Sequence, residues 1–287
     1  MKKIRFTWLD AALIVLILAV VVFIVHRVGV EMRYRWQWPV ILQYLVRLDG
    51  AHWAAGTLMQ GFLTTVKLSL WAMILAILLG TLMGLFRVSH GLFYRLIAGS
   101  YVETVRNLPP LVLVFIVYFF VGERIMTLLG VEHFVRSASP EVQRFLTLLF
   151  APPARLSGFL AGLATLVLYE AAYITEIVRA GIQSIEKGQW EAAHALGLSR
   201  WQQLRCAILP QALRRILPAL AGQLISTIKD SAIVSVISIP ELTFQGLELM
   251  SATYLTFEVW ITITALYFLL TFTCSLGVKR LETAWQR

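Results

Sequence analysis

Six long apolar segments, separated by polar loops, dominate the pattern of this 287-residue chain. A run of about 20 apolar residues crosses the ~30 Å hydrocarbon core of a bilayer as a helix. A helix also satisfies its own backbone hydrogen bonds, which lipid cannot do. The pattern therefore predicts an all-α integral membrane protein with six transmembrane helices. The predicted spans cover residues 11–25, 58–86, 108–129, 156–178, 213–239 and 257–278.

The composition supports this interpretation. Hydrophobic residues make up 59% of the chain and charged residues only 14%, against about 25% charged residues in soluble domains. That is too little polar surface to coat a water-soluble globule of this size. The net charge of +9 is no evidence for nucleic-acid binding, because basic residues in a membrane protein mostly set its orientation. Two separate cysteines and five scattered histidines indicate neither a disulfide framework nor a metal site.

The amino terminus has the layout of a signal peptide, with Lys2, Lys3 and Arg5 before the first apolar segment. No small-x-small cleavage site follows before His26, so we expect a retained signal anchor. The chain then divides into residues 1–57, an anchor helix with an external loop, and residues 58–287, a transmembrane domain. Fourteen Lys and Arg residues fall on one side of the predicted spans and eight on the other. The richer side is cytoplasmic by the positive-inside rule, which places both termini in the cytoplasm.

The inside loop, residues 179–212, predicts two short helices joined by a turn. Gly197 suits the left-handed position that ends a helix, and Ser199 with Gln202 can form a capping box for the next one. Pro210 stops or bends that second helix. An apolar stripe is formed by Trp190, Leu196, Trp201, Leu204 and Ile208.

The same loop carries a family resemblance. Glu191-Ala192-Ala193-x-x-x-Gly197, followed by Ala207-Ile208-Leu209-Pro210, resembles the signature loop of permease subunits of ABC importers, with Ala207 where the family usually has Ile. Other segments resemble the branch of that family that serves polar amino acids. They are residues 101–109, 173–182 and 229–232, and the Gly61, Thr65, Ser69 pattern with Gly80, Gly84 and Arg87 after it. The resemblance covers about residues 58–280.

The resemblance implies a five-helix permease core, here with one extra amino-terminal helix, in a bacterial cytoplasmic membrane. It implies that Glu191, Ala192, Ala193 and Gly197 belong to a coupling helix that docks on a separate ATPase subunit. ATP and Mg would be bound by that partner, so this chain needs no cofactor and is not itself an enzyme. Further implied partners are a second permease subunit, identical or different, and an extracytoplasmic binding protein that delivers the amino acid.

Several charged residues lie at or near membrane depth, where charge is costly and a functional role is the default hypothesis. Lys229 and Asp230 are candidates for the substrate pathway or for gating, or they pair with neighbours only to orient helices. Glu103 and Arg106 precede a span, where substrate contact and a capping ion pair are equally open.

Two further features have plain structural interpretations. Lys67 is expected to snorkel to the outer surface. Gly80-x-x-x-Gly84 favours close helix packing over dimerisation. In the 130–155 loop, residues 142–150 predict a short interfacial helix.

Three competing functions explain the chain less well. The inside loop also resembles a DNA-reading helix-turn-helix, but the flanking spans leave it little reach into a groove. A secondary transporter often shows inverted repeats with broken helices, which we do not find. An intramembrane enzyme needs an acid, base or metal set within the spans, and no phosphate loop or nucleophile motif is present.

Overall fold

A computed structural model describes residues 8–31, 34–49 and 52–285, and six of its helices are long and apolar enough to cross a membrane. The predicted all-α membrane architecture is thereby confirmed. The basic residues Lys2, Lys3 and Arg5, and the carboxy-terminal Arg287, lie outside the described residues. The candidate spans are Trp8–Arg27, Thr57–Val88, Pro110–Leu128, Pro153–Gln183, Arg200–Ile237 and Thr256–Arg280.

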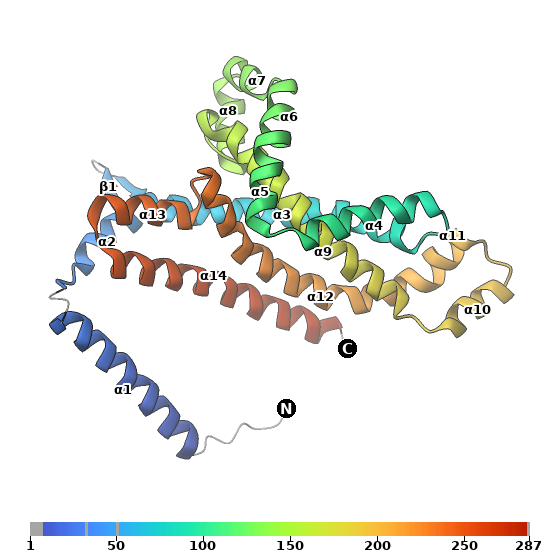
Figure 1. Cartoon of the computed structure of the whole chain (residues 1–287), viewed down its shortest axis with the longest axis horizontal. Coiled ribbons are helices and arrows are strands. Elements are labelled where there is room, and N and C mark those ends of the chain that lie inside the picture. The colour runs from blue at the N-terminus through green and yellow to red at the C-terminus, as the bar shows by residue number, and fades with distance from the viewer. Residues whose placement is uncertain (1–7, 32–33, 50–51, 286–287) are drawn as a thin grey trace.

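The amino-terminal part precedes a bundle of five helices (Figure 1). It consists of α1 (Trp8–Glu31), α2 (Trp38–Leu45) and an antiparallel hairpin of β1 (Val46–Asp49) and β2 (His52–Ala55), in which Val46 pairs with Ala55 and Leu48 with Trp53. The bundle helices are α3 (Thr57–Val88), α4 (Leu92–Asn107), α9 (Leu156–Gln183), α12 (Leu209–Asp230) and α14 (Thr256–Trp285).

Shorter elements connect the bundle helices. Between α4 and α9 lie α5 (Pro110–Ile116), the π-helical η1 (Val117–Gly122), α6 (Glu123–Leu128), α7 (Val131–Ser137), α8 (Pro140–Leu149) and the 3-10 turn η2 (Pro153–Arg155). Between α9 and α12 lie α10 (Lys187–Ala195), α11 (Arg200–Gln202) and the π-helical η3 (Gln203–Ile208). The 3-10 segment η4 (Ser231–Ile237) and α13 (Leu242–Thr253) follow α12.

Helices α3 and α9 form the central contact of the bundle. A Cβ atom on Gly80 would lie 2.7 Å from Cβ of Ile174, and one on Gly84 would lie 2.7 Å from Cβ of Val178. Real Cβ atoms do not approach so closely, so the two backbones can meet only because both positions lack a side chain. The packing interpretation of Gly80-x-x-x-Gly84 is confirmed as a contact within the chain.

Helix α4 runs back along the bundle from the end of α3, and the hydropathy pattern missed it. It packs against both α3 and α9, whereas α5, η1 and α6 run crosswise to the bundle (Figure 1). Segment 108–129 is helical and apolar enough to span, as predicted, and it stays packed on α9, because a Cβ on Gly122 would lie 3.1 Å from Cβ of Ala161. Arg95, Glu103 and Arg106 lower the hydropathy of α4, which hid it among the loops. The number of crossings is unchanged.

The residues from Tyr34 to α2 are attached to the bundle at the end where α3 and α14 begin. Ile41 of α2 is buried in a hydrophobic cluster with Leu58 and Val259. The fully buried Glu258 accepts hydrogen bonds from the Tyr34 hydroxyl and, at 2.7 Å, from the backbone N–H of Gln37. Burial, with the bond to Glu258, raises the pKa of Tyr34 to about 12. The expected boundary between residues 57 and 58 stays a prediction.

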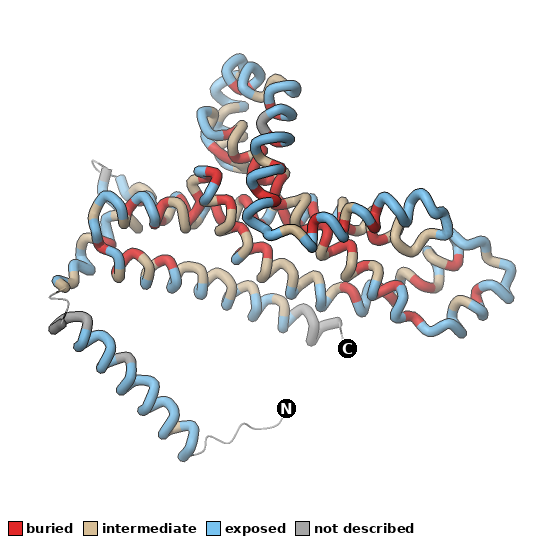
Figure 2. Tube along the Cα trace, in the orientation of Figure 1, coloured by how far each residue is buried: buried red, intermediate tan, exposed pale blue. Residues whose placement is uncertain are grey.

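Helix α1 differs from this segment because nearly all of its side chains face outward. Every described side chain except that of Ala11 is exposed (Figure 2). An apolar helix with no buried face is typical of a span surrounded by lipid.

The course of the crossing between α3 and α9 can be tested by labelling. In a variant without Cys206 and Cys274, we expect Asn107→Cys to resist a membrane-impermeant maleimide added to intact cells. Asn107 ends α4 next to Arg106, which contacts Tyr173 within the α9 span, so residues 110–128 must complete the crossing. Ser137→Cys should label from outside and Ser199→Cys only after permeabilisation. If Asn107→Cys labels from outside like Ser137→Cys, α4 crosses the membrane alone.

Candidate functional site

The first candidate site is the loop that follows α9. Helix α10 begins at Lys187, and it presents Glu191 and Ala192 to solvent while Ala193 is buried. Gly197 then has φ +72°, and nothing lies within 4 Å of the position that its Cβ would occupy. Backbone conformation, not space, therefore requires glycine here. The predicted left-handed turn is confirmed.

The predicted capping box that opens the second short helix is also present. The N–H of Gln202 donates to Oγ of Ser199 at 3.4 Å, and the N–H of Ser199 donates to Oε1 of Gln202 at 2.8 Å. Pro210 does not end this second helix. It lies in the first turn of α12, directly after the π-helical η3, where its missing N–H costs no helical bond.

The predicted apolar stripe of the loop is split between two surfaces. Ile208 is fully buried, and Trp190 and Leu204 pack against the same core cluster. Leu196 and Trp201 face outward with 79% and 60% of their surface exposed. Leu196 and Trp201, together with Glu191 and Ala192, form an exposed surface that has both apolar and polar side chains.

Hydrogen bonds hold the loop to the bundle. Gln211 of α12 donates to Oε1 of Gln189 on α10 at 3.0 Å, and Arg215 donates to the carbonyl of Ser184. The fully buried Gln203 donates to the carbonyl of Leu198 at 2.7 Å. These bonds tie the loop to the ends of α9 and α12.

The second candidate site is a cavity of about 590 Å³ with contributions from α4, α9 and α12. The guanidinium of Arg106 lies 5.3 Å from the ring centroid of Tyr173, within the range of a cation–π contact. Positively and negatively charged side chains both line the cavity. Its polar lining comprises Arg106, Tyr173, Glu176, Arg179, Ser184, Arg215 and Gln223.

A buried carboxylate, Glu170, lies one turn of α9 before Tyr173. It is fully buried, and one of its oxygens accepts from Nε2 of Gln223 at 2.7 Å. The other oxygen has no hydrogen-bond partner. Gln223, Thr227 and Asp230 occupy successive turns of one face of α12, and Gln223 contacts Glu170 directly. Polar groups from α9 and α12 thus meet in the interior of the bundle.

An ion-pair cluster joins helices at the end of the bundle near the loop that follows α9. Glu176 pairs with Arg179 at 2.6 Å and with Arg87 of α3 at 3.2 Å. Arg87 passes over Gly99 of α4, where a Cβ would lie 2.9 Å from the guanidinium. The cluster therefore joins three helices.

The structure separates the four pathway candidates. Arg106 lines the cavity, and the half-buried Asp230 ends α12 on the helix face that carries Gln223. Glu103 is exposed and accepts from Asn107 at 3.2 Å, and Lys229 is exposed. Sequence reasoning did not connect Glu170 with Gln223, because the two lie 53 residues apart and neither forms a local motif.

Comparisons with known proteins agree with this architecture. Residues 76–286 match the family described as "Binding-protein-dependent transport system inner membrane component". The glutamine transport system permease protein GlnP of Escherichia coli (strain K12) is 34% identical over 220 residues, which is 75% of this chain and 89% of that protein. The probable glutamine ABC transporter permease protein GlnM of Bacillus subtilis (strain 168) is 32% identical over 224 residues, covering 78% of this chain and 91% of that protein.

Two kinds of solved structure are similar. An amino acid ABC transporter crystallised with histidines superposes with a TM-score of 0.67 at 31% identity, covering 88% of this chain and 100% of that one. The MetNI methionine ABC transporter has a TM-score of 0.60 at 19% identity, covering 80% of this chain, and shows the shared fold alone.

The ion-pair cluster generates a stability prediction. Glu176→Gln leaves Arg87 and Arg179 without their carboxylate, so we expect the free energy of unfolding to fall by about 1.5–3 kcal/mol, as for hydrogen bonds to charged groups. Thermal unfolding of the purified protein in detergent measures it. Glu248→Gln, at an exposed position on α13, is the matched control. Equal midpoints for the two variants would show that the cluster contributes nothing.

Proposed function

This chain belongs to the family of binding-protein-dependent transport system inner membrane components, and we propose that it moves polar amino acids through an importer driven by a separate ATPase. The relatives named above are glutamine permeases, and the similar structure is an amino acid ABC transporter. Their identity to this chain supports the class of substrate.

One observation carries the proposal: a single helix, α9, joins the polar cavity to the exposed loop. Its Tyr173, Glu176 and Arg179 line the cavity, and only three residues separate its end at Gln183 from α10. A displacement of α10 by a partner is therefore transmitted directly to the cavity wall. This linkage is what an importer needs to convert the work of an ATPase into alternating access.

The cavity suits a zwitterionic amino acid. Arg106 and Arg215 can pair with an α-carboxylate, and Glu176 can attract an ammonium group. Glu170 of α9 and Asp230 of α12 offer further carboxylates. We propose Arg106 and Asp230 as pathway residues, because Arg106 lines the cavity and Asp230 shares a helix face with the cavity residue Gln223, whereas Glu103 and Lys229 are exposed.

The proposed partners follow from the exposed surfaces and the family. Leu196 and Trp201, with Glu191, form the surface for an ATPase that binds ATP and Mg. A second permease subunit completes the pathway, and an extracytoplasmic binding protein delivers substrate. Both termini are then cytoplasmic. The loop's attachment to α12 through Gln211 opposes the DNA-reading alternative, which needs a free helix.

The coupling role predicts that Gly197→Val abolishes transport while the spans stay folded. Valine at φ +72° strains the backbone by ~1–3 kcal/mol and tilts α10. We expect uptake in reconstituted vesicles to be lost, and ATP hydrolysis to lose its dependence on loaded binding protein.

Two variants control for side-chain bulk. Gly188→Val adds the same side chain in open space within helix α10, and should transport normally. Gly197→Asn tolerates the left-handed conformation and should restore most activity. Normal transport by Gly197→Val would remove this turn from the coupling mechanism.

A further prediction concerns the pathway. Asp230→Asn removes a charge beside Glu170 without changing side-chain volume much, so we expect uptake to fall at least about tenfold while the ATPase still co-purifies. Uptake and co-purification are measured on the same preparation, with Glu248→Gln as control. Loss of assembly would assign Asp230 to helix orientation instead.

A further inference from the structure

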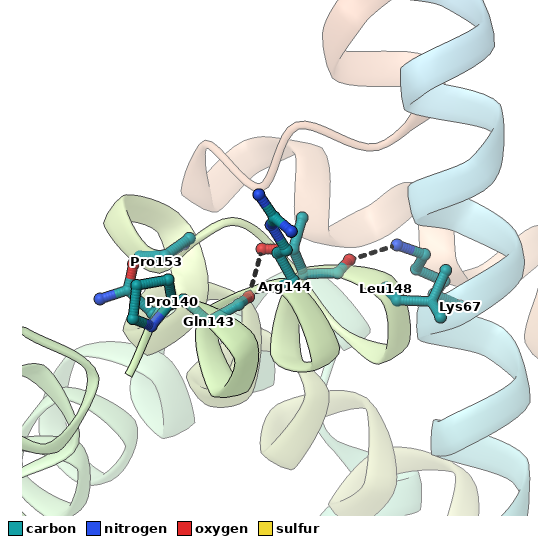
Figure 3. A pocket seen from close by; sticks show the side chains of 7 residues that line it. Lys67, Pro140, Gln143, Arg144, Leu148 and Pro153 are labelled. Carbon is teal, nitrogen blue, oxygen red and sulfur yellow. Dashed lines mark hydrogen bonds between the residues drawn. The ribbon is translucent and has the colours of Figure 1, made fainter. Parts of the chain in front are cut away.

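A second cavity of about 590 Å³ lies on the other side of the bundle, between α3 and α8 (Figure 3). One complete face of α8 lines it, with Lys67 of α3 and Pro153 of η2 opposite. The residues of α8 on this face are Pro140, Gln143, Arg144, Thr147 and Leu148. Nothing in the proposed transport cycle uses this cavity.

The lining of this cavity contains two cations and no carboxylate. Nζ of Lys67 donates to the carbonyl of Thr147 at 2.8 Å, in the last turn of α8, where the helix dipole favours positive charge. The ammonium keeps two further N–H donors. Arg144 forms no hydrogen bond or ion pair with the described part of the chain, and its guanidinium points away from α8 (Figure 3). The cavity therefore presents unused donors to an anion.

The depth of Lys67 follows from the length of α3. Lys67 and Arg87 are twenty residues apart on this helix, about 30 Å at 1.5 Å per residue. That is the thickness of the hydrocarbon core, so the two cations mark its two boundaries. Lys67 thus lies at the level of the outer headgroups, as expected for a snorkelling lysine, and its ammonium also caps α8.

The cavity opens onto surface that faces lipid. On α3, Leu63, Leu70 and Ile74 share the helix face of Lys67 and are 46%, 54% and 42% exposed. On α8, Phe145 and Leu148 are 61% and 70% exposed. A ligand that fits this site needs an anionic group for the two cations and an apolar part for the exposed leucine, isoleucine and phenylalanine side chains beside them. An acidic side chain of a water-soluble partner has no such apolar part.

We propose that this cavity binds an anionic phospholipid of the outer leaflet. Lys67 and Arg144 hold the phosphodiester, and the acyl chains lie along the apolar strip of α3. Zwitterionic lipids are disfavoured because the cations repel their ammonium groups. The bound lipid would fix α8 against α3 and so hold the external segment α5–α8 in place. The inference requires membrane insertion but not the proposed substrate or ATPase.

The test measures phosphatidylglycerol binding to the purified, delipidated complex by native mass spectrometry. We expect Arg144→Gln to weaken binding about tenfold, the loss that follows from removing a hydrogen bond to a charged group. Arg124→Gln is the control, because it removes the same charge from an exposed position on α6 that does not line the cavity. Arg144→Lys should retain most of the affinity, and phosphatidylcholine should bind weakly to all variants.

Three outcomes would overturn the proposal. Equal weakening by Arg124→Gln and Arg144→Gln would show that surface charge alone attracts the lipid. Displacement of the lipid by an equal concentration of inorganic phosphate would show a site for small anions. Unchanged lipid binding by Arg144→Gln, with loss of the ATPase stimulation by binding protein, would show that the cavity receives an acidic group of that protein. Lipid binding is measured without transport. A failure of the lipid proposal can therefore be distinguished from a failure of the proposed importer function.

Discussion

The close contact between α3 and α9 at Gly80 and Gly84 sets the positions of the elements that the proposed transport cycle uses. No side chain intervenes there, so the two backbones meet and the residues on either side of the contact are aligned. Further along α3, Arg87 pairs with Glu176 of α9, and its guanidinium also packs over Gly99 of α4. Bulk at either glycine would therefore separate the helices and break this ion pair together with the packing.

From this contact, α9 extends in two functional directions. Within the bundle it carries Glu170 and Tyr173 to meet α4 and α12. At its end it leads into α10, which Gln189 ties to α12 through Gln211. Cavity and loop are thus parts of one mechanical unit. The opposite end of the bundle is stabilised separately, by Glu258 and by the capping of α8.

Sequence reasoning succeeded where the physical signal is local. The left-handed Gly197 and the Ser199 capping box each depend on a few neighbouring residues, and both were predicted. Helix α4 was missed because its polar face lowers its mean hydropathy. The contacts of Glu170 with Gln223 and of Lys67 with Thr147 join residues 53 and 80 positions apart, and no local pattern encodes such pairs. Only the fold brings them together.

The central claim is that this chain conducts amino acids only when a partner hydrolyses ATP. The direct measurement is uptake of radiolabelled glutamine by vesicles that contain the purified chain, with or without its ATPase and binding protein. We predict uptake only when the ATPase and the binding protein are both present and ATP is supplied on the side of the membrane where the ATPase lies. Uptake by the chain alone, driven by a proton or sodium gradient, would contradict it and establish a secondary transporter.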